Sequence, residues 1–183
     1  MFDILNDIPY NGIMVNDKKR YSCCIIGHRK IEENINLIEK FINLIEKENI
    51  TIFNFGFYGE FNDLCYKVLL KLKLRYSQIK LVLYSLNNEV AYTFEEAEHI
   101  KQRYEKQNKF FPHKCFDEIN YLEDIDETKF KFACVLRNKK LINESDYCLF
   151  YCRENYTLSN NRNSGTKIAY EYAKEQNKNI ILI

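Results

Sequence analysis

Short apolar runs alternate along this chain with longer segments whose apolar residues recur at helical spacing. The short runs, bounded by glycine or polar residues, predict β-strands. The longer segments predict amphipathic helices, because their apolar side chains fall on one face. Apolar strands that alternate with helices are typical of an α/β protein whose parallel sheet is covered on both faces. The predicted strands are Tyr21–Ile26, Thr51–Phe55, Lys80–Ser85, Asp146–Cys152 and Asn179–Ile183.

The same pattern indicates the domain organisation. Residues 21–183 form one predicted domain, and residues 1–20 form a short N-terminal extension. A chain of 183 residues is long enough to bury a substantial core. Residues 87–127 have the weakest pattern. Helices are predicted over 31–48, Glu60–Leu74, 128–143 and Gly165–Gln176, with a polar helix over 94–107.

Charge and composition exclude some classes of partner. Lys and Arg total 27 and Asp and Glu total 26, so the chain lacks the basic excess typical of bulk nucleic-acid binding. No apolar run reaches the length of about 18 residues that a membrane span needs. The N-terminus, Met1-Phe-Asp-Ile-Leu-Asn-Asp, lacks the features of a secretory signal. We therefore expect a cytoplasmic protein with no membrane partner.

The chain has seven cysteines, an odd number, and no Cys-x-x-Cys pair. Cys23, Cys24, Cys134 and Cys148 lie in apolar runs, which favours small buried side chains over a metal site. His113 and Cys115 lie close in sequence, but nothing nearby completes a ligand set. We expect neither a metal site nor a cofactor.

Glycine marks the predicted turns between strands and helices. Four of the five glycines lie in predicted turns between a strand and the following helix: Gly27, Gly56, Gly59 and Gly165. In an α/β sheet these turns lie at the carboxyl edge, where ligands bind. Helix N-termini there offer free N–H groups and a partial positive charge, which suit phosphate. The first hypothesis is therefore a nucleotide-type ligand that needs bare backbone at these turns.

Polar side chains accompany the first two turns. His28 and Arg29 follow Gly27 and can bind anions, although a tight turn with a solvated arginine would have the same sequence. The second turn, Gly56-Phe-Tyr-Gly-Glu, is neither a dinucleotide fingerprint nor a Walker loop. Glu60 either complements the helix dipole or binds a ribose hydroxyl.

Arg137 is the third candidate, because it falls on an apolar helical stripe with Phe130, Ala133 and Leu141. A charge there costs free energy unless it is paired. Either it forms a salt bridge with a core acid such as Asp146, or it points toward a ligand anion. A competing stripe through Phe132 and Leu136 would place it at a boundary.

The turn before the last helix, Ser164-Gly-Thr, is the fourth candidate. Ser164 is suited to an N-cap, and the hydroxyls with the free N–H groups of Gly165 and Thr166 are suited to phosphate. No nucleophile elbow, zincin motif or P-loop lysine occurs. Core packing is the default interpretation of the tyrosines, and base stacking is the alternative for Tyr58, Tyr151 and Tyr156.

Taken in order, several short motifs resemble those of the SLOG superfamily, and more closely those of its small bacterial members. The resemblance spans residues 21–183. It implies a Rossmann-like three-layer sandwich with a mostly parallel sheet of about five strands. It also implies a ligand related to nucleotides or ADP-ribose, a homodimer, and a role in nucleotide signalling in bacterial defence. The motifs are Cys24-Ile-Ile-Gly-His-Arg, Phe55-Gly-Phe-Tyr-Gly-Glu-Phe, Arg137-Asn, Ser145-Asp146 and Ser164-Gly-Thr-x-x-Ala-Tyr-x-Tyr-Ala.

Within that superfamily, the LOG phosphoribohydrolases combine an arginine with the pattern P-G-G-x-G-T-x-E-E. Arg137 and Gly165-Thr166 match it, and Asn138 follows the arginine as in the small members. The paired acids are missing, since Lys167, Ile168 and Ala169 follow Thr166. Cleavage of an N-glycosidic bond benefits from a carboxylate at the sugar.

The leading hypothesis is therefore a non-catalytic protein that senses or sequesters a nucleotide-derived ligand. The alternative is a phosphoribohydrolase, nucleosidase or deoxyribosyltransferase-like enzyme that uses Glu60 or another acid. The expected ligand-binding residues are Gly27, His28, Arg29, Gly56, Gly59, Glu60, Arg137, Asn138, Ser164, Gly165 and Thr166.

Overall fold

The computed structural model describes most of the predicted domain. The described residues are 19–31, 36–56, 59–86, 116–122, 124–125, 130–152 and 164–183. The predicted N-terminal extension up to residue 18 and the predicted polar helix over 94–107 lie outside them. Among the described residues, no helix combines the length and apolar character that a membrane crossing requires.

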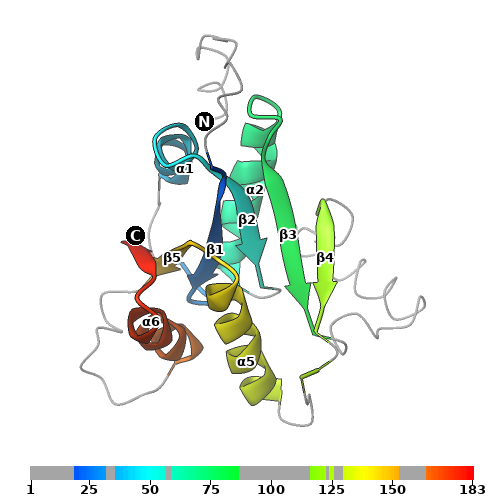
Figure 1. The fold of residues 1–183 in the computed structure, drawn as a ribbon, viewed down its shortest axis with the longest axis vertical. Coiled ribbons are helices and arrows are strands. Elements are labelled where there is room, and N and C mark those ends of the chain that lie inside the picture. Colours follow the sequence, from blue (N-terminus) through cyan, green and yellow to red (C-terminus); the bar gives the residue numbers. More distant parts are fainter. Residues whose placement is uncertain are drawn as a thin grey trace.

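A six-stranded sheet forms the centre of the molecule (Figure 1). All neighbouring strands are parallel, in the order β4-β3-β2-β1-β5-β6. The sheet grows from β1 in one direction and then, from β5, in the other, so β1 and β5 flank a topological switch point. The strands are β1 (Tyr21–Gly27), β2 (Ile50–Phe55), β3 (Lys80–Ser85), β4 (Glu118–Tyr121), β5 (Tyr147–Tyr151) and β6 (Asn179–Leu182).

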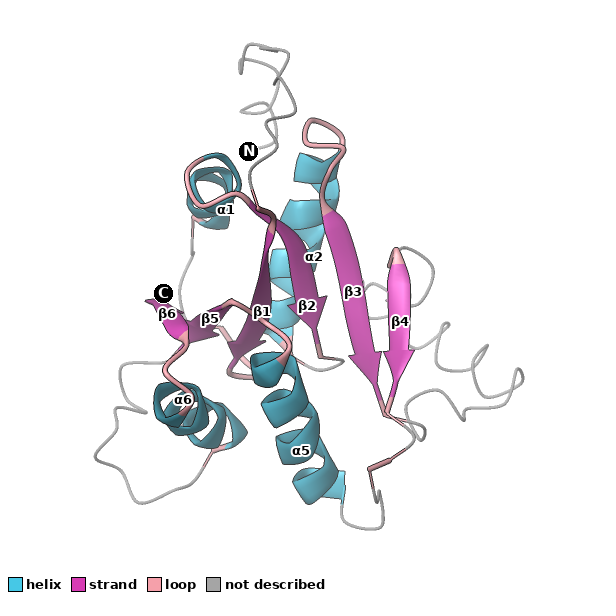
Figure 2. Ribbon diagram, viewed as in Figure 1, coloured by secondary structure: helices cyan, strands magenta, loops and turns pink. Residues whose placement is uncertain are grey.

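Helices cover both faces of the sheet, which gives three layers (Figure 2). The helices α1 (Leu37–Glu46) and α2 (Glu60–Lys73) pack on one face, and α5 (Phe130–Asn143) and α6 (Gly165–Glu175) pack on the other. Successive side chains of β1 alternate between the two cores, as the pleat of a strand requires. Cys23 and Ile25 join the core under α1 and α2, whereas Cys24 and Ile26 join the other.

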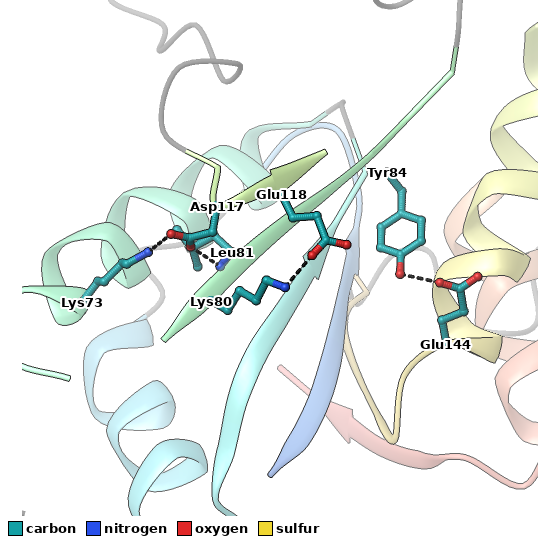
Figure 3. A network of polar contacts seen from close by, with 7 residues as sticks. All are labelled: Lys73, Lys80, Leu81, Tyr84, Asp117, Glu118 and Glu144. Carbon is teal, nitrogen blue, oxygen red and sulfur yellow. Dashed lines mark hydrogen bonds and ion pairs between the residues drawn. The ribbon is translucent and has the colours of Figure 1, made fainter. Parts of the chain in front are cut away.

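The predicted α/β class and layered architecture are confirmed, with one strand more than predicted. The additional strand, β4, lies in the stretch whose pattern is weakest. It is a short edge strand that pairs with β3, and polar side chains at its start contact β3 and α2 (Figure 3). Asp117 pairs with Lys73 and accepts from the Leu81 N–H at 2.7 Å, and Glu118 pairs with Lys80. An apolar run does not mark such a strand, so its sequence gives no signal.

The other elements follow the prediction to within a few residues, and one helix starts later than predicted. The segment predicted as helix over 31–48 contains α1, which begins at Leu37, and residues 32–35 lie outside the described part. In α5 the stripe with Ala133 and Leu141 is the buried one. Phe132, on the competing stripe, is 56% exposed, which places Arg137 on the core-facing side.

Candidate functional site

A pocket of about 630 Å³ lies at the carboxyl edge of the sheet. Its lining comes from the turns after β1 and β2, from α5 and from the start of α6. Figure 1 shows how these elements are arranged. This is the switch-point position at which open α/β sheets bind ligands. The described lining consists of Ile25, Ile26, Gly27, His28, Arg29, Lys30, Gly56, Asn62, Lys131, Cys134, Val135, Arg137, Asn138, Ser164, Gly165, Thr166 and Ile168.

The charged side chains that the described residues contribute to this pocket are all basic. Arg29, Lys30 and Lys131 are exposed and form its rim. Arg137 is only 4% exposed and forms its interior. Low local dielectric strengthens the attraction between a buried cation and an anion. The pocket therefore favours an anionic ligand, with the strongest contribution expected at Arg137.

Arg137 takes its position because Gly56 has no side chain. A Cβ atom at position 56 would lie 3.1 Å from Nε of Arg137, 3.3 Å from its Cζ and 3.4 Å from its Nη2. The guanidinium thus packs directly on the backbone that follows β2. The bare backbone at Gly56 makes room for an arginine of the pocket, and a methyl group there would force the guanidinium to shift by a few tenths of an ångström.

The alternative of a salt bridge between Arg137 and Asp146 is wrong. The Asp146 carboxylate accepts hydrogen bonds from the backbone N–H and the hydroxyl of Ser22, each at 2.9 Å. Ser22 lies near the start of β1, at the amino edge of the sheet. Arg137 packs beyond the end of β2, at the opposite edge. The Ser145-Asp146 motif therefore joins β1 to β5 at a distance from the pocket.

Gly27 is required for a different reason. A Cβ atom there would lie 2.3 Å from Cδ1, 2.7 Å from Cγ and 2.9 Å from Cβ of Phe61. The Phe61 ring in turn stacks on Tyr151, with ring centroids 5.1 Å apart and an interplanar angle of 19°. Gly27 lines the pocket, but its missing side chain serves the packing of α2 on β1. Tyr151 belongs to the core, whereas Tyr58 and Tyr156 lie outside the described residues.

The start of α6 presents backbone donors to the pocket. Ser164 is the N-cap, and its Oγ accepts from the Lys167 N–H at 3.1 Å. The Ile168 N–H donates to the Ser164 carbonyl at 3.0 Å, so the amides of Gly165 and Thr166 precede this first helical hydrogen bond. Among the described residues, and apart from its chain neighbours and the backbone of α6 itself, no atom lies within 4 Å of a Cβ added at Gly165. Packing therefore does not explain the glycine at position 165, and the space beside it is open.

Gly59 and Glu60 lie behind the first turn rather than in the pocket lining. Gly59 has a φ of 122°, a conformation that glycine adopts readily. The Glu60 N–H donates to the Arg29 carbonyl at 2.9 Å, and one Glu60 carboxylate oxygen accepts from the Ile31 N–H at 3.1 Å. The structure therefore places these two predicted ligand residues against the turn that carries His28 and Arg29.

The pocket unites residues that are far apart in the sequence. The nine other predicted ligand residues all line it: Gly27, His28, Arg29, Gly56, Arg137, Asn138, Ser164, Gly165 and Thr166. Lys30, Asn62 and Lys131 line it as well and were not predicted. Asn62 donates from Nδ2 to the Gly56 carbonyl at 3.5 Å and is buried, which only the fold shows. Lys131 has the sequence signature of any solvated lysine.

The cysteines are mostly core residues. Cys23, Cys24, Cys65 and Cys148 have no exposed surface, and burial raises the pKa of the Cys23 and Cys65 thiols. Cys134 is half-buried and lines the pocket. Within the described part of the chain, no cluster of three or more His, Cys, Asp or Glu side chains is arranged to hold a metal ion.

No protein-family model matches the chain. No curated protein is similar to it at a significant level. The function is therefore argued from the pocket.

Proposed function

We propose that this protein binds a phosphate-bearing, nucleotide-derived small molecule, such as a nucleotide or an ADP-ribose-like compound, and senses or sequesters it. The observation that carries the proposal is the position and charge of one pocket. It lies at the switch point of a parallel sheet, and the charged side chains of its described lining are all basic. Parallel α/β sheets use this position for nucleotide ligands.

Two kinds of donor support phosphate as the anion. The guanidinium of Arg137 is planar and forms paired hydrogen bonds to phosphate oxygens, which a lysine ammonium does not. The amides of Gly165 and Thr166 add backbone donors at the positive end of the dipole of α6. Both line the same pocket, so one phosphate group or two linked ones would meet both.

The size and the apolar wall of the pocket support a nucleoside portion. A volume of about 630 Å³ is within the range of small-molecule sites, roughly 300–1,000 Å³. Ile26, Val135 and Ile168 give it an apolar surface. An apolar wall with a few convergent polar groups is the usual anatomy of such sites.

Kinship with the SLOG superfamily is part of the same proposal. Four of the five matching motifs contribute residues to the pocket, and only Ser145-Asp146 does not. The contributing residues are Gly27-His28-Arg29, Gly56, Arg137-Asn138 and Ser164-Gly165-Thr166. Under this kinship the protein acts as a homodimer in nucleotide signalling, for example in bacterial defence. Sedimentation of the purified protein near twice the chain mass of 22.1 kDa would support the dimer.

The experiment that tests the function is recovery of the natural ligand. The protein is purified natively and denatured, and the released small molecules are identified by mass spectrometry. Fresh protein is then incubated with each compound found and with AMP, ADP and ADP-ribose. A nucleotide that is recovered and stays intact supports sensing or sequestration. Release of free base or ribose phosphate would support the enzymatic alternative, and absence of any binding would contradict the proposal.

A further inference from the structure

The turn after β1 carries three basic or titratable residues of the pocket, and neighbouring elements hold it at several points. His28, Arg29 and Lys30 all line the pocket. The His28 N–H donates to the Tyr151 carbonyl at 3.3 Å, which ties the start of the turn to β5. The Glu60 N–H donates to the Arg29 carbonyl at 2.9 Å, which ties its middle to the start of α2.

The end of the turn is held by a side chain. One carboxylate oxygen of Glu60 accepts from the Ile31 N–H at 3.1 Å. Gly59 packs against the same turn, since a Cβ added to it would lie 3.4 Å from Cα of Arg29. The last two residues of the second glycine turn, Gly59 and Glu60, thus support the first glycine turn from behind.

The charge of Glu60 works against a direct role in binding an anion. A carboxylate close to Arg29 and Lys30 lowers the positive potential that attracts phosphate. Glu60 also lies outside the described lining of the pocket. A contribution of this residue to anion binding must therefore come through the geometry of the turn.

We propose that Glu60 is a positioning residue, which holds the turn from His28 to Lys30 in the conformation that presents its basic side chains to the ligand. The inference rests on the proposed function, because the turn matters only if the pocket binds an anion. A turn that is ordered before binding loses less conformational entropy on binding, and this raises affinity. This role is an alternative to the ribose-binding role and the catalytic role that the sequence left open for Glu60.

Three variants separate positioning from the other roles of Glu60. Glu60→Ala removes the acceptor of the Ile31 N–H. Glu60→Gln keeps an acceptor oxygen at the same place but removes the charge. Asp63→Asn removes an equal charge from the same first turn of α2 and is the matched control for effects of charge on the helix dipole.

The first measurement needs no ligand. Hydrogen exchange of the Ile31 amide in the free protein is expected to be at least about threefold faster in Glu60→Ala than in the wild type. It is expected to stay near the wild-type rate in Glu60→Gln and Asp63→Asn. An unchanged rate in Glu60→Ala, or an equal acceleration in Glu60→Gln, would overturn the inference.

The second measurement is the affinity for ADP-ribose by calorimetry. Glu60→Ala is expected to bind about fivefold more weakly, and Glu60→Gln within about twofold of the wild type or more tightly. Equal weakening in both variants would instead assign Glu60 to direct contact with the ligand. If the wild type binds none of AMP, ADP and ADP-ribose, the proposed function fails, while the exchange of the Ile31 amide still decides whether Glu60 holds the turn.

Discussion

The guanidinium of Arg137 packs against the backbone of Gly56. A methyl group at position 56 would lie closer to the guanidinium than ordinary van der Waals contact allows. A Cβ at position 56 would come within 3.1 Å of Nε of Arg137. Gly56 follows β2 and Arg137 comes from α5, so this contact joins the two walls of the pocket. The position of the buried Arg137 guanidinium on α5 therefore depends on Gly56, which follows β2.

Gly56→Ala is therefore expected to weaken ligand binding without unfolding the protein. The guanidinium is the far end of a flexible side chain and would move by a few tenths of an ångström. The free energy of unfolding is expected to change by about 1 kcal/mol or less, and the affinity for ADP-ribose to fall about tenfold. Urea titration and calorimetry measure the two quantities. An unchanged affinity for ADP-ribose in Gly56→Ala would contradict a contact between Arg137 and the ligand.

Gly27→Ala is expected to act on stability instead. The added methyl group would overlap the Phe61 ring, whose Cδ1 would lie 2.3 Å away in a fully buried position. Overpacking of a core typically costs about 1–3 kcal/mol, and this overlap is with three atoms of one buried side chain. Urea denaturation followed by circular dichroism is the measurement. A variant as stable as the wild type would contradict the tight contact between α2 and β1.

Gly165→Ala is the contrasting glycine variant. The side chain has open space, and alanine is a better helix former, so the free energy of unfolding is expected to be unchanged or to rise by about 0.5–1 kcal/mol. The same methyl group would occupy space in front of the first amides of α6, and binding of ADP-ribose is expected to weaken. A less stable Gly165→Ala protein would contradict the open space beside Gly165. Unchanged affinity for ADP-ribose would show that the start of α6 does not contact the ligand.

Asp117 predicts how the edge of the sheet responds to acid. Although burial opposes it, the hydrogen bond from the Leu81 N–H and the pairing with Lys73 lower the pKa of Asp117 below its ordinary value of 3.8. A lowered pKa in the folded state means that Asp117 stabilises the fold above pH 3.8, and that this contribution is lost as the pH falls through the folded-state pKa. Figure 3 shows these contacts between β4, β3 and α2.

Asp117→Asn is therefore expected to be about 1 kcal/mol less stable than the wild type at pH 7. The difference is expected to shrink as the pH falls below about 4, because the wild-type carboxylate becomes protonated. Urea denaturation at pH 7, 4 and 3 measures it. A difference that stays constant across this range would show that the charge of Asp117 does not act at β4.

The sequence predicts much of this fold because burial of apolar side chains leaves apolar runs in strands and apolar stripes on helices. The central strands are apolar runs, and Arg137 is visible as a charge on the Ala133–Leu141 stripe of a helix. β4 is not visible, because Asp117 and Glu118 hold it through lysines that come from distant parts of the chain.

The reasons for the glycines cannot be read from the neighbouring sequence, because they depend on residues far along the chain. Their positions at turns follow from the sequence, but the need for Gly27 depends on the Phe61 ring and the need for Gly56 depends on Arg137. In the same way, Glu60 is recognisable as an acid at a helix start. Only the fold places its carboxylate at the Ile31 N–H rather than in the pocket.

The most direct test of the account is the contribution of Arg137 to binding. Calorimetric titration with ADP-ribose would compare the wild type with Arg137→Met, which keeps an unbranched side chain but removes the charge. Arg20→Met is the matched control, because Arg20 is exposed and precedes β1 at the opposite edge of the sheet. All three proteins would first be compared by thermal unfolding.

The account predicts that the wild type and Arg20→Met bind with equal affinity, and that Arg137→Met binds about 10- to 100-fold more weakly, as expected for loss of charge-assisted hydrogen bonds. Wild-type affinity in a folded Arg137→Met protein would contradict the claim that this basic pocket binds the phosphate of a nucleotide-derived ligand.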